Sequence, residues 1–107
     1  MTAGADQAIP SEDSAGLALR DFEGRIGTVF RIQTEFGEQE LVLHSAKEIP
    51  GSPRPEGGFQ LEFTGPFEPR LHQGIYGFPI DGALHEIFIV AIGVNPEQRL
   101  RYEAVFF

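Results

Sequence analysis

The three histidines are the side chains of this sequence best suited to hold a metal ion, but their spacing does not bring them together. His44, His72 and His85 lie far apart along the chain, and no two of them are spaced as a ligand pair on one element. The chain has no cysteine, which excludes disulfides, thiolate catalysis and cysteine-bound zinc. We therefore expect surface or hydrogen-bonded histidines, no metal site and no cofactor.

Nucleophilic catalysis has equally little support. None of the serines, at positions 11, 14, 45 and 52, lies in a Gly-x-Ser-x-Gly turn. Ser45 follows His44 directly, so the two side chains point to opposite faces of a strand. We expect no catalytic residues and a protein that is not an enzyme.

Glu103 is the carboxylate whose surroundings are most unusual. It alternates with Val105 and Phe107 along the end of the chain. A carboxylate among apolar neighbours could act as an acid or base. The more common role is a structural anchor, and Arg25, Arg70 and Arg101 are the candidate partners. We expect the anchor, with contact to a partner protein and catalysis as alternatives.

The segment Gln73-Gly74-Ile75-Tyr76 is the most specific local motif. A glutamine amide can bridge two strands, and a tyrosine can bury its ring with its hydroxyl near solvent. A structural corner at the mouth of a barrel is the simpler interpretation, and recognition of a ligand or peptide is the other. In the loop just before this motif, Phe67 and Leu71 either plug the core or form a binding hot spot.

The elements that must position these residues are mostly strands. A short helix is expected within 17–26, with Leu19, Phe22 and Ile26 on one face, followed by six strands. We expect the strands at about 29–36, 39–49, 59–63, 73–80, 84–92 and 99–107, with a two-residue hairpin turn at Asp81-Gly82. The sequence therefore predicts an all-β, mainly antiparallel fold: a six-stranded barrel or barrel-like sandwich formed by residues 14–107, preceded by a mobile acidic arm at 1–13.

The strand at 84–92 is apolar on both faces, so its orientation decides what the protein exposes. We expect its Phe88 and Val90 to join a shared interior with residues of the other strands: Phe30, Leu41, Leu43, Phe59, Leu61, Phe63, Tyr102, Ala104 and Phe106. Ile87 and Ile89 would then face outward together with Val105 and Phe107 of the last strand. Either the helix at 17–26 or another molecule would have to cover that outer face.

The composition of the chain disfavours some classes of binding partner. The net charge is −8, with 16 acidic and 8 basic residues, which disfavours nucleic acid and anionic membranes. No signal peptide and no stretch of transmembrane length is visible, so a cytoplasmic protein is the default expectation, and export by another route remains open.

Three groups of residues together resemble the DUF6916 family of small bacterial domains of unknown function. They are Phe22 with Ile26-Gly27 and Phe30; the run from Phe59 through Gly65-Pro66 to Tyr76; and the run from Ile87 through Gly93 to Phe106. The resemblance implies no catalytic residues. It implies an association with genes for phage-tail-collar-like, fibre-forming proteins.

We therefore expect a non-enzymatic protein-interaction or assembly module that binds a protein partner or a second copy. The residues expected to contact the partner are Phe67, Leu71, Gln73, Tyr76, Ile87, Ile89, Val105 and Phe107. The alternative is a small β-barrel that binds an apolar ligand in its interior.

Overall fold

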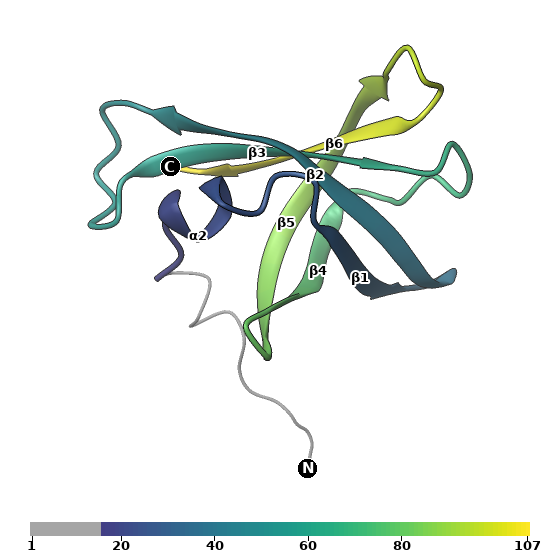
Figure 1. Ribbon diagram of the computed structural model, residues 1–107, viewed down its shortest axis with the longest axis horizontal. Helices are drawn as coiled ribbons and strands as arrows, with labels where there is room; N and C mark the ends of the chain where they lie inside the picture. The colour runs from purple at the N-terminus through teal and green to yellow at the C-terminus, as the bar shows by residue number, and fades with distance from the viewer. Residues whose placement is uncertain (1–15) are drawn as a thin grey trace.

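The computed structural model describes residues 16–107, and the arm expected at 1–13 lies outside them. Six antiparallel strands form a nearly closed barrel with one short helix (Figure 1), so the predicted fold class is confirmed. The elements are α2 (Arg20–Glu23), β1 (Val29–Thr34), β2 (Gly37–Ile49), β3 (Gly58–Gly65), β4 (Gly74–Ile80), β5 (Ala83–Val94) and β6 (Leu100–Phe106).

The strands pair in the order β1-β2-β3-β6-β5-β4, which leaves β1 and β4 at the two ends of the sheet. These two end strands lie beside each other (Figure 1), but no strand pairing joins them. The barrel therefore has one seam that side-chain packing closes. Pro79 stands in β4, as expected for an edge strand, because a proline cannot donate to a ladder.

Strand β5 changes its partner along its length. Its first part pairs with β4, with Tyr76 opposite Ile87, and its last part pairs with β6, with Ala91 opposite Tyr102. A β-bulge between Ala91 and Gly93 marks the pairing with β6. The turn at Asp81 and Gly82 has φ angles of 52° and 82°, so the predicted hairpin turn sets the register of β4 against β5.

The interior is filled by apolar side chains, and most of the predicted core is confirmed. The buried cluster contains Leu17, Phe22, Phe30, Ile32, Leu41, Leu43, Phe59, Leu61, Phe63, Leu71, Phe78, Ile80, Ile87, Ile89, Leu100, Tyr102 and Ala104, with Phe106 packed against it. The prediction for β5 is wrong. Ile87 and Ile89 are buried, whereas Phe88 is half-exposed and Val90 is only partly buried.

Helix α2 plugs the end of the barrel at which β3 begins and β6 ends (Figure 1). Phe22 is fully buried, and its ring centroid lies 5.7 Å from that of Phe59 and 6.5 Å from that of Phe106. Gly24 ends the helix. Ile26 is exposed, so only part of the predicted apolar face is used. The helix does not cover the outer face of β5.

Replacing Phe22 with alanine should lower the free energy of unfolding by about 3–5 kcal/mol, because it removes a fully buried aromatic side chain and leaves a cavity. Because alanine is compatible with a helix, the loss of stability measures the lost packing of the ring and not a weakened helix. Urea unfolding measures it. Ile26→Ala is the matched control, with an expected change within about 0.5 kcal/mol because the side chain is exposed. Equal losses in the two variants would contradict the plug.

Candidate functional site

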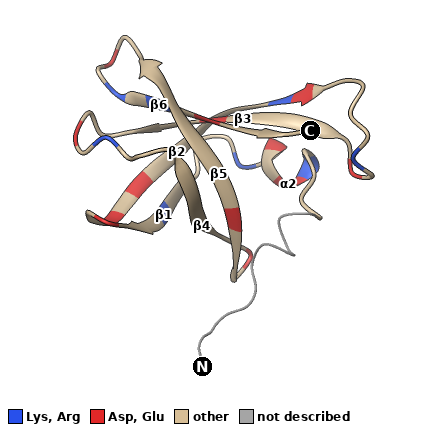
Figure 2. Ribbon diagram, turned by 180° about the vertical axis from the view of Figure 1, so that it is seen from behind, with Lys and Arg blue, Asp and Glu red and all other residues tan. Residues whose placement is uncertain are grey.

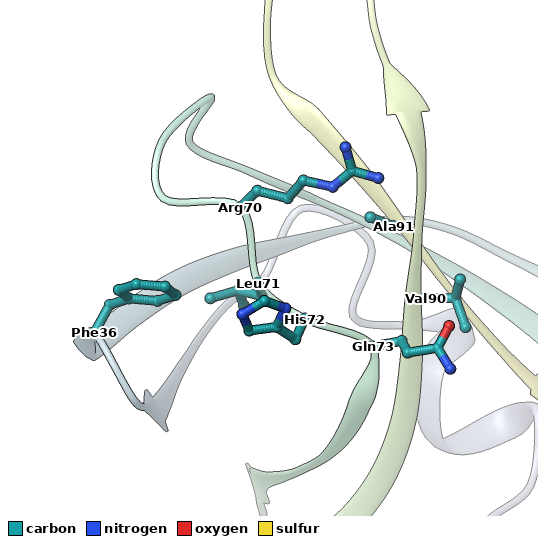
Figure 3. Close-up of a pocket in the computed structure, with 7 residues that line it drawn as sticks. All are labelled: Phe36, Arg70, Leu71, His72, Gln73, Val90 and Ala91. Atoms are coloured by element: carbon teal, nitrogen blue, oxygen red, sulfur yellow. The ribbon is translucent and has the colours of Figure 1, made fainter.

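A depression of about 470 Å³ opens at the barrel surface, where the loop before β4 meets β5 and the β1–β2 turn. Figure 3 shows the arrangement, with Phe36 on one side of Leu71 and with Gln73 and Val90 on the other. We call this hollow the loop depression; its lining residues are Phe36, Arg70, Leu71, His72, Gln73, Val90 and Ala91.

Three polar contacts fix the loop that forms this depression. The backbone N–H of Leu71 donates to the hydroxyl of Tyr102 at 3.0 Å, deep in the core. The hydroxyl of Tyr76 donates to the carbonyl of His72 at 2.8 Å. The imidazole of His72 lies 3.3 Å from the carboxylate of Glu35, beside the β1–β2 turn. The loop is thereby held to the core, to β4 and to β1–β2 at once.

Burial raises the pKa values of both tyrosine hydroxyls. It raises the pKa of Tyr102, against the opposing effect of the Leu71 N–H. It also raises the pKa of Tyr76, with a smaller contribution from the charge of Glu35. Both hydroxyls therefore stay protonated at neutral pH and serve as structural hydrogen-bonding groups.

The rim of the depression carries polar groups that the fold does not use. Among residues 16–107, neither Arg70 nor Gln73 makes a side-chain hydrogen bond or ion pair. Within the described residues the Gln73 amide therefore does not bridge two strands. Each of the other arginines in the described chain donates a hydrogen bond to a side chain or carbonyl. Arg70 is thus an exception within an acidic chain.

A second candidate surface is the outer face of the β4–β5 hairpin. Ile75 and Phe88 stand directly opposite each other and are 63% and 50% exposed. Leu84 is 54% exposed and lies over Gly77, where a Cβ atom would come 3.6 Å from its Cδ2. We call Ile75, Leu84, Phe88 and the adjacent Val90 the β4–β5 strip. It is an exposed apolar surface on two paired strands, and Glu86 stands between Leu84 and Phe88 within it.

The expected partner contacts are only partly compatible with this geometry. Ile87, Ile89 and Leu71 are buried and cannot meet a partner, because their side chains belong to the core. Leu71 is the plug, as one interpretation of the loop predicted, whereas Phe67 stands out from the loop. Val105 and Phe107 are exposed, as expected. Contact with a partner remains a prediction for every exposed member of the set.

The sequence does contain a signal for the β4–β5 strip. The turn at Asp81-Gly82 fixes the register, and that register places Gly77 and Pro79 on the same face as Glu86 and Phe88. A charge, a glycine and a proline are typical of an outer face. Combined with the register that the hairpin turn sets, Gly77, Pro79 and Glu86 predict that Phe88 lies on the outer face of the barrel.

Glu103 is held by an amide rather than by the expected arginine. The Gln60 side chain donates to its carboxylate at 2.9 Å. The nearby Arg101 instead donates two hydrogen bonds to Glu62, at 2.8 and 3.0 Å. These bonds from Arg101 lower the pKa of Glu62, although partial burial opposes the effect. The carboxylates of the outer β3–β6 face are therefore engaged in the structure of the sheet.

The described residues offer no arrangement for metal binding. Within residues 16–107 no group of three or more histidine or acidic side chains could hold an ion. His44 and His72 lie at the surface, as expected, but His85 differs: its Nδ1 atom is buried and has no hydrogen-bond partner in the described part of the chain.

Comparison with known protein families identifies one that matches most of the chain. The family described as "Domain of unknown function (DUF6916)" matches residues 17–106. Searches of curated proteins and of solved structures found no match. From residue 16 to residue 107, no helix has the length and apolar character needed to cross a membrane.

Replacing Tyr102 with phenylalanine should destabilise the protein by about 1–3 kcal/mol, because the N–H of Leu71 would remain buried without an acceptor. Chemical unfolding measures the loss, and amide exchange at Leu71 should quicken. Tyr76→Phe is the control, since it removes an exposed hydrogen bond and should cost less than about 1 kcal/mol. A larger cost for Tyr76→Phe would show that the loop is held at the surface instead.

Proposed function

The chain belongs to the DUF6916 family, and we propose that it is a non-enzymatic protein-interaction module whose contact surface is the β4–β5 strip. The observation that carries this proposal is the exposed pair of Ile75 and Phe88 with Leu84 beside it. Single exposed apolar residues are ordinary, but several exposed apolar residues gathered on one face of two paired strands are typical of an interface.

The strip can supply useful binding free energy. Full burial of an isoleucine, leucine or phenylalanine side chain contributes roughly 1.5–3 kcal/mol, and about half of each of these three side chains is still exposed. Covering them therefore provides about 3 kcal/mol before other contacts are made. The paired strands hold these side chains in place, so little conformational entropy is lost on binding.

Charge favours a different protein over a second copy as the partner. Strands β4 and β5 contain no lysine or arginine, so neither strand carries blue in Figure 2. In the sequence of β5, Glu86 stands between Leu84 and Phe88. Two copies packed strip to strip would bring Glu86 side chains into an interface without a cation, in a chain of net charge −8. A partner with apolar residues and a basic residue opposite Glu86 fits better.

The association with phage-tail-collar-like, fibre-forming proteins is a finer part of the proposal. It rests on the family resemblance and not on geometry. The alternative of an apolar ligand inside the barrel is not favoured, because side chains fill the buried cluster. A surface ligand is a separate possibility that the loop depression raises.

The test is site-specific photo-cross-linking in cells that produce the protein. A benzoylphenylalanine at position 88 should give a discrete cross-linked protein product, because Phe88 lies at the centre of the strip. The product should disappear when Ile75→Glu is added. Phe88→Ser should change the free energy of unfolding by less than about 1 kcal/mol, which shows that the fold survives changes at this position.

Position 29 supplies the control, because Val29 is also an exposed apolar residue of a strand but lies on β1 and is not part of the strip. Benzoylphenylalanine there should not give the same product. Identical products from positions 29 and 88, or no product from position 88, would contradict the proposal. A product whose mass is twice that of the chain would identify a second copy as the partner and reject the argument from charge.

A further inference from the structure

The loop depression combines an unused cation with an apolar floor. Its floor and walls are made by Leu71, Val90, Ala91 and the half-exposed ring of Phe36. Arg70 also lines the depression, and its guanidinium is directed toward the side on which Ala91 lies (Figure 3). We propose that the depression is a binding site for a carboxylate attached to a short apolar group, such as an aryl or branched alkyl chain.

The unpaired state of Arg70 is the first argument. The chain has 16 acidic and 8 basic residues, so a basic side chain has many possible carboxylate partners. The other arginines use hydrogen bonds to fix the fold, yet among the described residues Arg70 has neither an ion pair nor a hydrogen bond. A guanidinium presents a planar array of N–H donors that matches a carboxylate in two parallel hydrogen bonds.

The charge of the site selects a monoanion. Arg70 provides one full positive charge, and the imidazole Nε2 of His72 lies 3.3 Å from the carboxylate of Glu35, which already occupies it. The net charge of −8 repels a phosphate dianion more strongly than a single carboxylate. Gln73, on the rim of the depression, adds an amide N–H donor that is not used within the described residues.

The shape of the site selects an apolar body. A volume of about 470 Å³ falls within the range of roughly 300–1,000 Å³ that is usual for small-molecule sites. The contact between the His72 imidazole and the Glu35 carboxylate joins the loop to the β1–β2 turn, and the ring of Phe36 lies facing Leu71 (Figure 3). An aryl group can therefore lie against a preformed apolar surface while its carboxylate meets Arg70.

Two sources carry this chemistry: a free carboxylic acid, and the C-terminal residue of a peptide chain. The site is separate from the contact surface proposed above. It shares Val90 with the β4–β5 strip, but Ile75, Leu84 and Phe88 do not line it. Failure of one proposal therefore leaves the other standing.

The test is a ¹H–¹⁵N NMR titration of the full chain with 3-phenylpropionate and, separately, with the tetrapeptide Gly-Gly-Ala-Phe. We expect dissociation constants on the order of 1 mM, as befits small ligands on an open surface. The shifts should centre on the amides of His72, Gln73 and Ala91. The same tetrapeptide with a C-terminal amide should bind at least about tenfold more weakly, because it lacks the charge.

Arg70→Gln should weaken binding of 3-phenylpropionate by about tenfold. Lys47→Gln is the matched control: within residues 16–107 Lys47 is the other basic side chain without an ion pair or hydrogen bond, and it does not line the depression. It should leave binding unchanged, as should Phe88→Ser. Binding of either ligand supports the site, and binding of the free acid alone or of the peptide alone identifies the source. No binding by either ligand at 20-fold the expected constant (about 20 mM), or equal loss in Arg70→Gln and Lys47→Gln, overturns the proposal.

Discussion

The structure depends on one constraint: a strand can turn only one of its two sets of side chains toward the core. Strand β5 carries apolar residues in both sets, so either choice would give a buried apolar face. The choice that the fold makes buries Ile87 and Ile89 and leaves Phe88 outside. A shift of one residue would exchange the two sets completely. The β4–β5 strip exists because of this choice, and so does the place of Val90 in the loop depression.

Two features of the chain enforce the choice. The turn at Asp81 and Gly82 sets β5 against β4, so that Tyr76 and Phe78 share the inner face with Ile87. The bulge after Ala91 then adjusts the pairing with β6, where Ala91 lies opposite the buried Tyr102. Because Tyr102 accepts the N–H of Leu71, the same residue that closes the core also holds the loop around the depression. The two candidate surfaces therefore have a common structural origin.

The sequence predicted the fold class because alternation and turn residues are local signals. The strand positions, the hairpin turn and the inward-facing side chains of β6 all followed from such signals. The orientation of β5 did not, because alternation says nothing about direction when both faces are apolar. It required combining the turn register with the outer-face residues Gly77 and Glu86. The candidate site was visible only in part: the Gln73 and Leu71 region was recognised, but the unpaired state of Arg70 depends on contacts between segments distant in sequence.

The orientation of β5 is the central claim, and solvent relaxation of isoleucine methyl groups tests it most directly in the unaltered protein. A soluble gadolinium complex broadens the methyl signals that it can approach. The account predicts strong broadening for Ile75, on the exposed strip, and protected signals for Ile87 and Ile89, which are buried. Broadening of Ile87 and Ile89 comparable to that of Ile75 would show that β5 presents the opposite face, and would contradict the account.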